Sequence, residues 1–223
     1  MEFFLWFVPI AFICEWIVPW FAEKAAKSPW HKGHIAERYG LLTIIVLGES
    51  LLALSVAIST SGNIGSWSFE QHLLIVSGLV IVCTMWWLYF SENEHQALER
   101  AETAFVWGYG HLIVFASAAA VGAGLALNVD VLSGLALIDG LVADAALTIP
   151  AALFLLGLWF VHDQFNHKQG LLRYLIPVTA LLLLGATYAP ATPALTAILM
   201  SCCLMIRIKS ETFTKDSHVP SSQ

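Results

Sequence analysis

Seven long apolar runs restrict this 223-residue chain to a membrane fold. A helix needs about 20 apolar residues to cross the roughly 30 Å hydrocarbon layer of a bilayer. Polar, Gly- and Pro-containing breaks separate the runs, which predicts seven spans at about 3–22, 39–60, 73–91, 104–127, 138–161, 171–188 and 192–208. The expected fold is therefore all-α, a polytopic transmembrane helical bundle over 1–208. The polar segment 209–223 is predicted to be a disordered cytosolic tail.

The ten Lys and Arg residues orient the predicted bundle. All of them fall in the loops after the first, third, fifth and seventh runs or in the ends of the runs that border these loops: Lys24, Lys27, Lys32, Arg38, Arg100, Lys168, Arg173, Arg207, Lys209 and Lys215. Loops on the cytosolic side of a membrane carry an excess of these residues. We therefore expect an outside N-terminus, an inside C-terminus and a multi-pass protein of the cell inner membrane.

Composition excludes several classes of protein. Charged residues make up 12% of the chain, whereas soluble domains carry about 25%. The dispersed cations form no basic stripe, so the expected partner is the lipid bilayer and not nucleic acid. The four cysteines lack metal-ligand spacing, and no nucleotide-binding or hydrolase motif occurs. We expect no catalytic residue, metal or cofactor, and the balance is against an enzyme.

Glu49, near the centre of the second run, is the most costly residue in the sequence. Placing a carboxylate at that depth costs about 2.5 kcal/mol or more of insertion free energy, so it must face a polar partner or a water-filled cavity, or remain protonated. His34, Arg38 and Glu49 project within roughly 60° of one another on a helix, and Glu37 lies one turn from His34. Arg38 and Glu49 are about 16 Å apart along the axis. The sequence predicts a polar stripe from a cytosolic mouth to the bilayer midplane.

Glu15 in the first run and His111 in the fourth lie at compatible depths. We expect them to join Glu49 in an intramembrane cluster, since Glu and His side chains linked by hydrogen bonds or water can relay protons. The alternatives are local pairing or snorkelling for Glu15 and His111, and a solvated helix start for the residues of the mouth.

Three further features have plain structural interpretations. Asp144 is expected to be an interfacial acid near the outer end of the fifth run. His162 and Asp163 are expected in a hydrated loop. The small residues between 118 and 124 let a neighbouring helix approach closely, which favours packing over a sliding or dimer interface.

Residues 34–50 combine H-x-x-E-R, an apolar stretch and G-E-S at a spacing that resembles the bacterial low temperature requirement A (LtrA) family of membrane proteins. Two later segments also resemble family patterns: Trp86-Trp87-Leu88-Tyr89-Phe90 and Tyr109-Gly110-His111-Leu112. The resemblance marks His34, Glu37, Arg38, Gly48, Glu49 and His111 as family-pattern positions without assigning them roles. It also implies a short member or the C-terminal portion of a longer one.

The leading functional prediction is movement or sensing of a small ion or solute through a polar site centred on Glu49. The first alternative is a non-transporting sensor or partner subunit whose polar cluster holds helices together. The second is an intramembrane enzyme acting on a lipid head group. A homo-oligomer or a complementary membrane subunit is compatible with each of these.

Overall fold

The computed structural model describes residues 31–62, 67–91, 101–163 and 170–217, together with nine positions between 7 and 21. These residues form helices and no strand, which confirms the all-α prediction. The long helices are α2 (Lys32–Thr60), α3 (Phe69–Phe90), α4 (Ala101–Leu132), α5 (Gly140–Leu158), α6 (Leu175–Ala186) and α7 (Thr192–Ser217). A π-helical turn, Trp159–Asp163, extends α5, and a 3-10 turn, Gly170–Tyr174, precedes α6.

Within the residues that the structure describes, five helices are long and apolar enough to cross a membrane: α2, α3, α4, α5 with its π-turn, and α7. A shorter apolar helix, Leu172–Ala186, corresponds to the sixth predicted span. The first predicted span lies mostly outside the described residues, so the count of seven stays a prediction, as does the orientation. α7 continues past residue 208 to Ser217, and residues 218–223 of the predicted tail lie outside the described residues.

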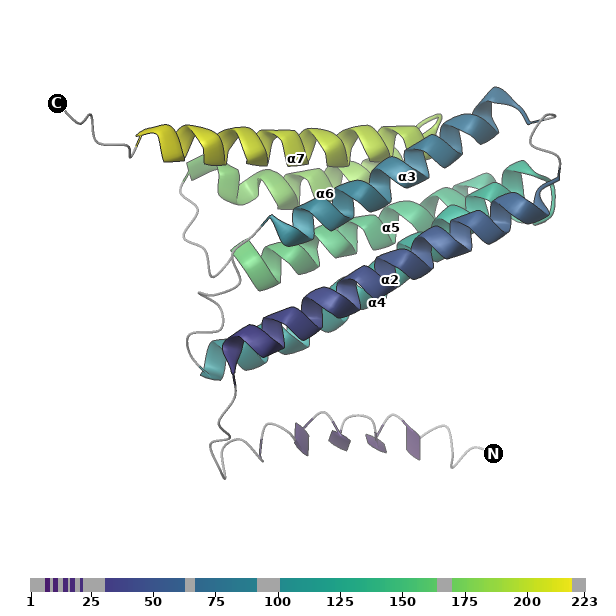
Figure 1. Cartoon of the computed structure of the whole chain (residues 1–223). Helices are drawn as coiled ribbons and strands as arrows, with labels where there is room; N and C mark the ends of the chain where they lie inside the picture. The colour runs from purple at the N-terminus through teal and green to yellow at the C-terminus, as the bar shows by residue number, and fades with distance from the viewer. Residues whose placement is uncertain are drawn as a thin grey trace.

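The helices pack side by side in one bundle (Figure 1). α4 packs against both α2 and α5, α6 packs against α5, and α7 packs against α3 and α6. Since consecutive helices alternate in direction, α3, α5 and α7 begin at the end where α2, α4 and α6 finish. We call this the Asp144 end and the opposite one the Arg207 end. The sequence predicts that the Arg207 end faces the cytosol.

Local hydrogen bonds fix where the helices of the Asp144 end begin. At α3 the Gln71 N–H donates to Ser68 Oγ (3.3 Å), and the Ser68 N–H donates to Gln71 Oε1 (2.8 Å). Asp139 caps α5 by accepting from the Leu141 N–H at 3.0 Å. Such caps contribute about 1 kcal/mol each. At the first residue of α7, the Thr192 hydroxyl is shared between two carbonyls of the preceding turn, those of Ala189 at 2.9 Å and Ala186 at 3.2 Å.

A hydrophobic core runs through the described helices, and their outer surface is apolar as well. Leu181 and Met205 are 68% and 66% exposed. An apolar exterior suits contact with lipid chains. In a membrane both the core and the lipid-facing surface of a bundle are apolar, so the polarity of a side chain does not show which of the two it faces.

Candidate functional site

The predicted mouth residues lie on the exposed side of the first turns of α2. His34 Nδ1 and Glu37 Oε2 are 3.7 Å apart, and both side chains are largely exposed. Arg38 is also exposed and lines a groove between α2 and α4. The structure therefore brings His34 and Glu37 together and leaves Arg38 beside them on the surface.

Glu49 is exposed, next to the residue that anchors α2 to the bundle. Ser50 is 2% exposed, and its hydroxyl donates across to the Ala118 carbonyl of α4 at 3.1 Å. Successive helical residues project 100° apart, so the rotation that buries Ser50 turns Glu49 outward. Of the five spanning helices that the structure describes, α2 is the least buried, with 28% of its apolar stretch inside the bundle against 39–50% in the other four.

His111 is fully buried on α4 and joins two helices. Its Nδ1 lies 2.7 Å from the Trp107 carbonyl, which can only accept, so Nδ1 carries the proton. In the neutral ring Nε2 then accepts from the Tyr89 hydroxyl of α3, 3.1 Å away. The ring centroids of Tyr39 on α2 and His111 are 4.9 Å apart. Glu15 and Glu49 are exposed in the part of the chain that the structure describes, whereas His111 is buried, so their predicted clustering stays a prediction.

Asp163 and Arg207 form a buried ion pair at the same end of the bundle. Arg207 Nη2 donates to Asp163 Oδ1 at 2.8 Å and Nη1 donates to Oδ2 at 3.2 Å. The π-turn after α5 continues the helix beyond Leu158 and carries His162 and Asp163 into the interior, where they are 4% and 6% exposed. The prediction of a hydrated loop was wrong for these two residues, because backbone hydrogen bonding continues past the apolar run.

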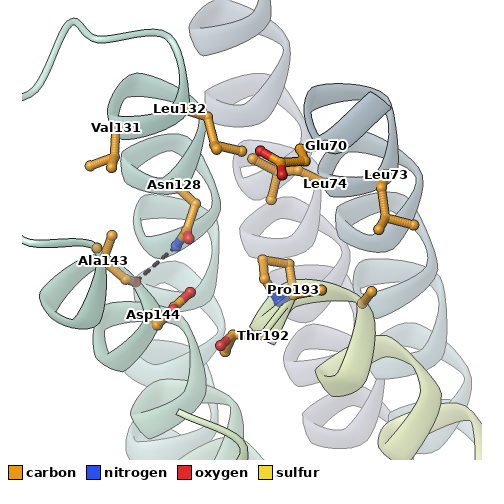
Figure 2. Close-up of a pocket in the computed structure, with 13 residues that line it drawn as sticks. Glu70, Leu73, Leu74, Asn128, Val131, Leu132, Ala143, Asp144, Thr192 and Pro193 are labelled. Atoms are coloured by element: carbon orange, nitrogen blue, oxygen red, sulfur yellow. Dashed lines mark hydrogen bonds between the residues drawn. The ribbon is translucent and has the colours of Figure 1, made fainter. Parts of the chain in front are cut away.

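A pocket of about 270 Å³ opens at the Asp144 end (Figure 2). We call it the Asp144 pocket. Four helices supply its polar side chains: Glu70 from α3, Asn128 from α4, Asp144 from α5 and Thr192 from α7. Figure 2 shows these side chains around the pocket, between apolar residues such as Leu74. No Lys, Arg or His lines the pocket among the described residues.

The Asn128 side chain presents an oxygen to this pocket. Its Nδ2 group donates to two backbone carbonyls on the wall, those of Gly124 and Ala143, both at 2.8 Å. Because both neighbours are acceptors, only the NH₂ group can face them, and this fixes the orientation of the amide. Oδ1 therefore lies on the other side, towards the space that Asn128 lines. Asn128 is 7% exposed, so this oxygen is held in place by the bundle.

Two hydroxyl groups of α7, those of Thr192 and Thr196, lie one turn apart near this end of the bundle, and only Thr192 lines the pocket. The Thr192 hydroxyl donates to backbone carbonyls of the preceding turn, and its side chain lines the pocket together with the Asp144 carboxylate. One turn further along α7, the Thr196 hydroxyl is fully buried and has no hydrogen-bond partner among the described residues. A buried hydroxyl without a partner is uncommon and is often satisfied by water or a ligand.

Sequence reasoning treated Asp144 as an interfacial acid and did not single out Glu70, Asn128 or Thr192. The available signal was an excess of oxygen-bearing residues at the predicted outer ends of the spans, where no Lys or Arg occurs. The sequence could not show that these ends meet. Among the described residues, no three His, Cys, Asp or Glu side chains gather in a way that could hold a metal ion.

Residues 1–208 match the family described as bacterial low temperature requirement A protein (LtrA). The chain belongs to this family. It is also 33% identical over 87 residues to an uncharacterised protein of Rhizobium meliloti (strain 1021), a match that covers 35% of the chain and 20% of that relative. The chain thus spans about a fifth of the relative's length. No solved structure matches it.

Membership of the LtrA family confirms the resemblance found in the sequence. Together with the apolar helices, it establishes a multi-pass membrane protein. The family-pattern positions fall in two different surroundings: the α2 positions, among them Gly48 and Glu49, lie mainly on an exposed surface, whereas His111 is 0% exposed.

Proposed function

We propose that this LtrA-family protein moves or senses a small cation that binds in the Asp144 pocket. The observation that carries the proposal is the convergence of oxygen-bearing side chains from four helices on a pocket without a basic lining residue. Two of them are carboxylates, and the Asn128 carbonyl is fixed towards the pocket by its amide hydrogen bonds. Hard cations prefer carboxylate, carbonyl and water oxygens.

The size of the pocket suits an ion that keeps part of its hydration shell. About 270 Å³ accommodates several waters, since each occupies about 30 Å³ in the liquid. A partly hydrated ion needs only a few direct protein ligands. This matches a site with two acids and two neutral oxygen-bearing side chains.

Helix dipoles supply a competing explanation for the acids. The described helices α3, α5 and α7 begin at this end, and Glu70 lies in the first turn of α3. An acid in that position stabilises the helix by about 0.3–1 kcal/mol. This role predicts an effect on stability that does not depend on the cation in solution. Asp144 lies in the second turn of α5, further from the N-terminus, and is the better residue for a test.

The first prediction is a cation-dependent increase in thermal stability. We expect one of Na⁺, K⁺, Mg²⁺ or Ca²⁺, compared with choline, to raise the unfolding temperature of the detergent-purified protein. A ligand present at 100 times its dissociation constant stabilises the folded state by about 2.7 kcal/mol. Asp144→Asn should remove most of that increase, because it takes a charge from the pocket while preserving the shape of the side chain.

Asp130→Asn is the matched control. Asp130 lies near the same end on α4 but does not line the pocket, so this variant should keep the full increase. An equal increase in the parent and in Asp144→Asn, or no increase with any of the four cations, would contradict the proposal.

The second prediction concerns Glu49 and remains separate, since α2 contributes no lining residue to the pocket. We propose that Glu49 is a protonatable midplane group on a surface that another helix covers, with His34, Glu37 and Arg38 as its approach. The support is the cost of exposing a carboxylate to lipid, together with the low burial of α2.

In vesicles that contain the reconstituted protein, Glu49→Gln should abolish any pH-coupled flux that the parent shows. Its thermal stability should be equal or higher, because acids with a functional role are often costly to the fold. Ser55→Ala, at another exposed polar position of α2, should keep the flux. Unchanged flux in Glu49→Gln would refute a role for this carboxylate.

A second candidate function is a non-transporting sensor or partner subunit. It is favoured by the contacts of His111, which tie α4 to α3 and resemble a structural anchor. For this function no flux would be found for any ion tested. Cations would also change the unfolding temperature of Asp144→Asn by the same amount as that of the parent.

A further inference from the structure

A second concave surface lies between α2 and α4 at the Arg207 end. This groove has a volume of about 450 Å³ and is lined by Arg38, Tyr39, Leu42, Gly108, Tyr109, Leu112 and Phe115. Gly108 helps to form it, since a Cβ at this position would lie 3.0 Å from the Tyr39 hydroxyl. Leu42 and Leu112 are 43% and 47% exposed, so lipid chains can reach the apolar part of the groove.

Polarity changes along the groove with depth in the membrane. Arg38 and the two tyrosines lie at one end, beside the start of the apolar stretch of α2. Leu42 lies one turn deeper than Arg38, and Leu112 lies one turn deeper than Gly108. Arg and Tyr are typical of the headgroup boundary, whereas Leu suits the hydrocarbon region. The groove therefore has the same order of polarity as a phospholipid in the adjacent leaflet.

Arg38 is the charged group of this groove. Its side chain is exposed, and no carboxylate of the described residues pairs with it. The adjacent Glu37 lies instead against His34, at 3.7 Å. A guanidinium group binds phosphate through two parallel N–H donors, which makes arginine well suited to this ligand.

We propose that the groove binds an anionic phospholipid of this leaflet. Arg38 donates to the phosphate, the tyrosines lie at the level of the headgroup, and an acyl chain packs over Leu42 and Leu112. A free phosphate ion would satisfy Arg38 but would leave the apolar surface without a ligand. The combination of a cation at the boundary with a lipid-accessible apolar groove favours the lipid.

Lipid retention by native mass spectrometry provides the test. The purified protein is equilibrated with equal amounts of phosphatidylglycerol and phosphatidylcholine in mixed micelles, and the lipids that remain bound are counted. We expect the parent to prefer phosphatidylglycerol. One cation near the membrane surface changes the affinity for anionic lipid by about fivefold, so Arg38→Gln should reduce the preference by about that factor.

Arg173→Gln is the matched control. Arg173 is an exposed cation at the same end, outside the groove, and its described hydrogen bond uses the backbone carbonyl, which accepts from Trp159 Nε1 at 3.2 Å. This variant should keep the preference. An equal loss in Arg173→Gln would show a general charge effect and overturn the proposal.

A competition experiment distinguishes the lipid from a free anion. Millimolar inorganic phosphate should displace little phosphatidylglycerol from the parent, since it makes no contact with the apolar surface. Complete displacement would identify a phosphate-ion site and refute binding of a lipid.

Discussion

Replacing Arg207 with methionine should lower the free energy of unfolding by about 3–5 kcal/mol. Asp163 is 6% exposed and receives two hydrogen bonds from the guanidinium group, at 2.8 and 3.2 Å. The variant would remove the Arg207 charge and both of its hydrogen bonds from this buried carboxylate. Denaturant titration of the protein in detergent micelles would measure the loss. This pair joins the π-turn after α5 to α7, so the loss should affect the whole Arg207 end.

Two further variants test the origin of this effect. Asp163→Leu combined with Arg207→Met should recover most of the lost stability, because apolar residues of similar size often replace a buried ion pair at little cost. Lys209→Met, at an exposed cation two residues away, should cost at most about 1 kcal/mol. If Arg207→Met and Lys209→Met cost the same, the buried pair is not what holds these elements together.

The positions of the helices were predictable because the membrane imposes a length on each apolar run. The run 73–91 became α3 (Phe69–Phe90), and the run 192–208 became the first part of α7. The differences lie at the ends, where caps such as Ser68 and the continuation of the helix past Leu158 decide the boundary. Such features depend on hydrogen bonds that hydropathy does not describe.

The direction in which each helix faces was not predictable. In a helix of a soluble protein, the polar side faces the solvent. In a membrane, lipid and protein core are both apolar. Ile45 on the outside of the bundle and Leu47 on the inside are therefore equally hydrophobic, and the sequence does not distinguish them. Helical periodicity placed His34, Arg38 and Glu49 on one side of α2, and in the structure all three are exposed. Periodicity alone does not show whether that side of α2 packs against another helix or faces lipid.

The Asp144 pocket shows a second limit of the sequence. Its polar residues come from four helices, and Glu70 and Thr192 are more than 100 positions apart in the chain. Nothing in a single sequence pairs them. Arg207 shows the same limit, because counting it among the cytosolic cations gave no indication that it would pair with Asp163 in the interior.

Replacing Gly124 with alanine should destabilise the protein by about 3 kcal/mol or more, at or beyond the upper end of the usual cost of overpacking. A Cβ at this position would overlap the Ala146 carbonyl and come within 2.9 Å of Leu147 Cα, so α4 and α5 would have to separate. Backbone atoms cannot move aside as a flexible side chain can. Denaturant titration in micelles would measure the change.

Gly185→Ala supplies the matched control, because the chemical change is the same and nothing lies within 4 Å of the added atom. It should stabilise α6 by about 0.5–1 kcal/mol, the usual advantage of alanine over glycine in a helix. Gly122→Ala tests the other side of α4, since its Cβ would lie 2.6 Å from Ser50 Cα of α2. Losses at both glycines and a gain at Gly185 would show that the small residues of α4 serve close packing against two neighbours. A small effect at Gly124 would instead mean that α4 and α5 can slide or separate at little cost, as a moving interface requires.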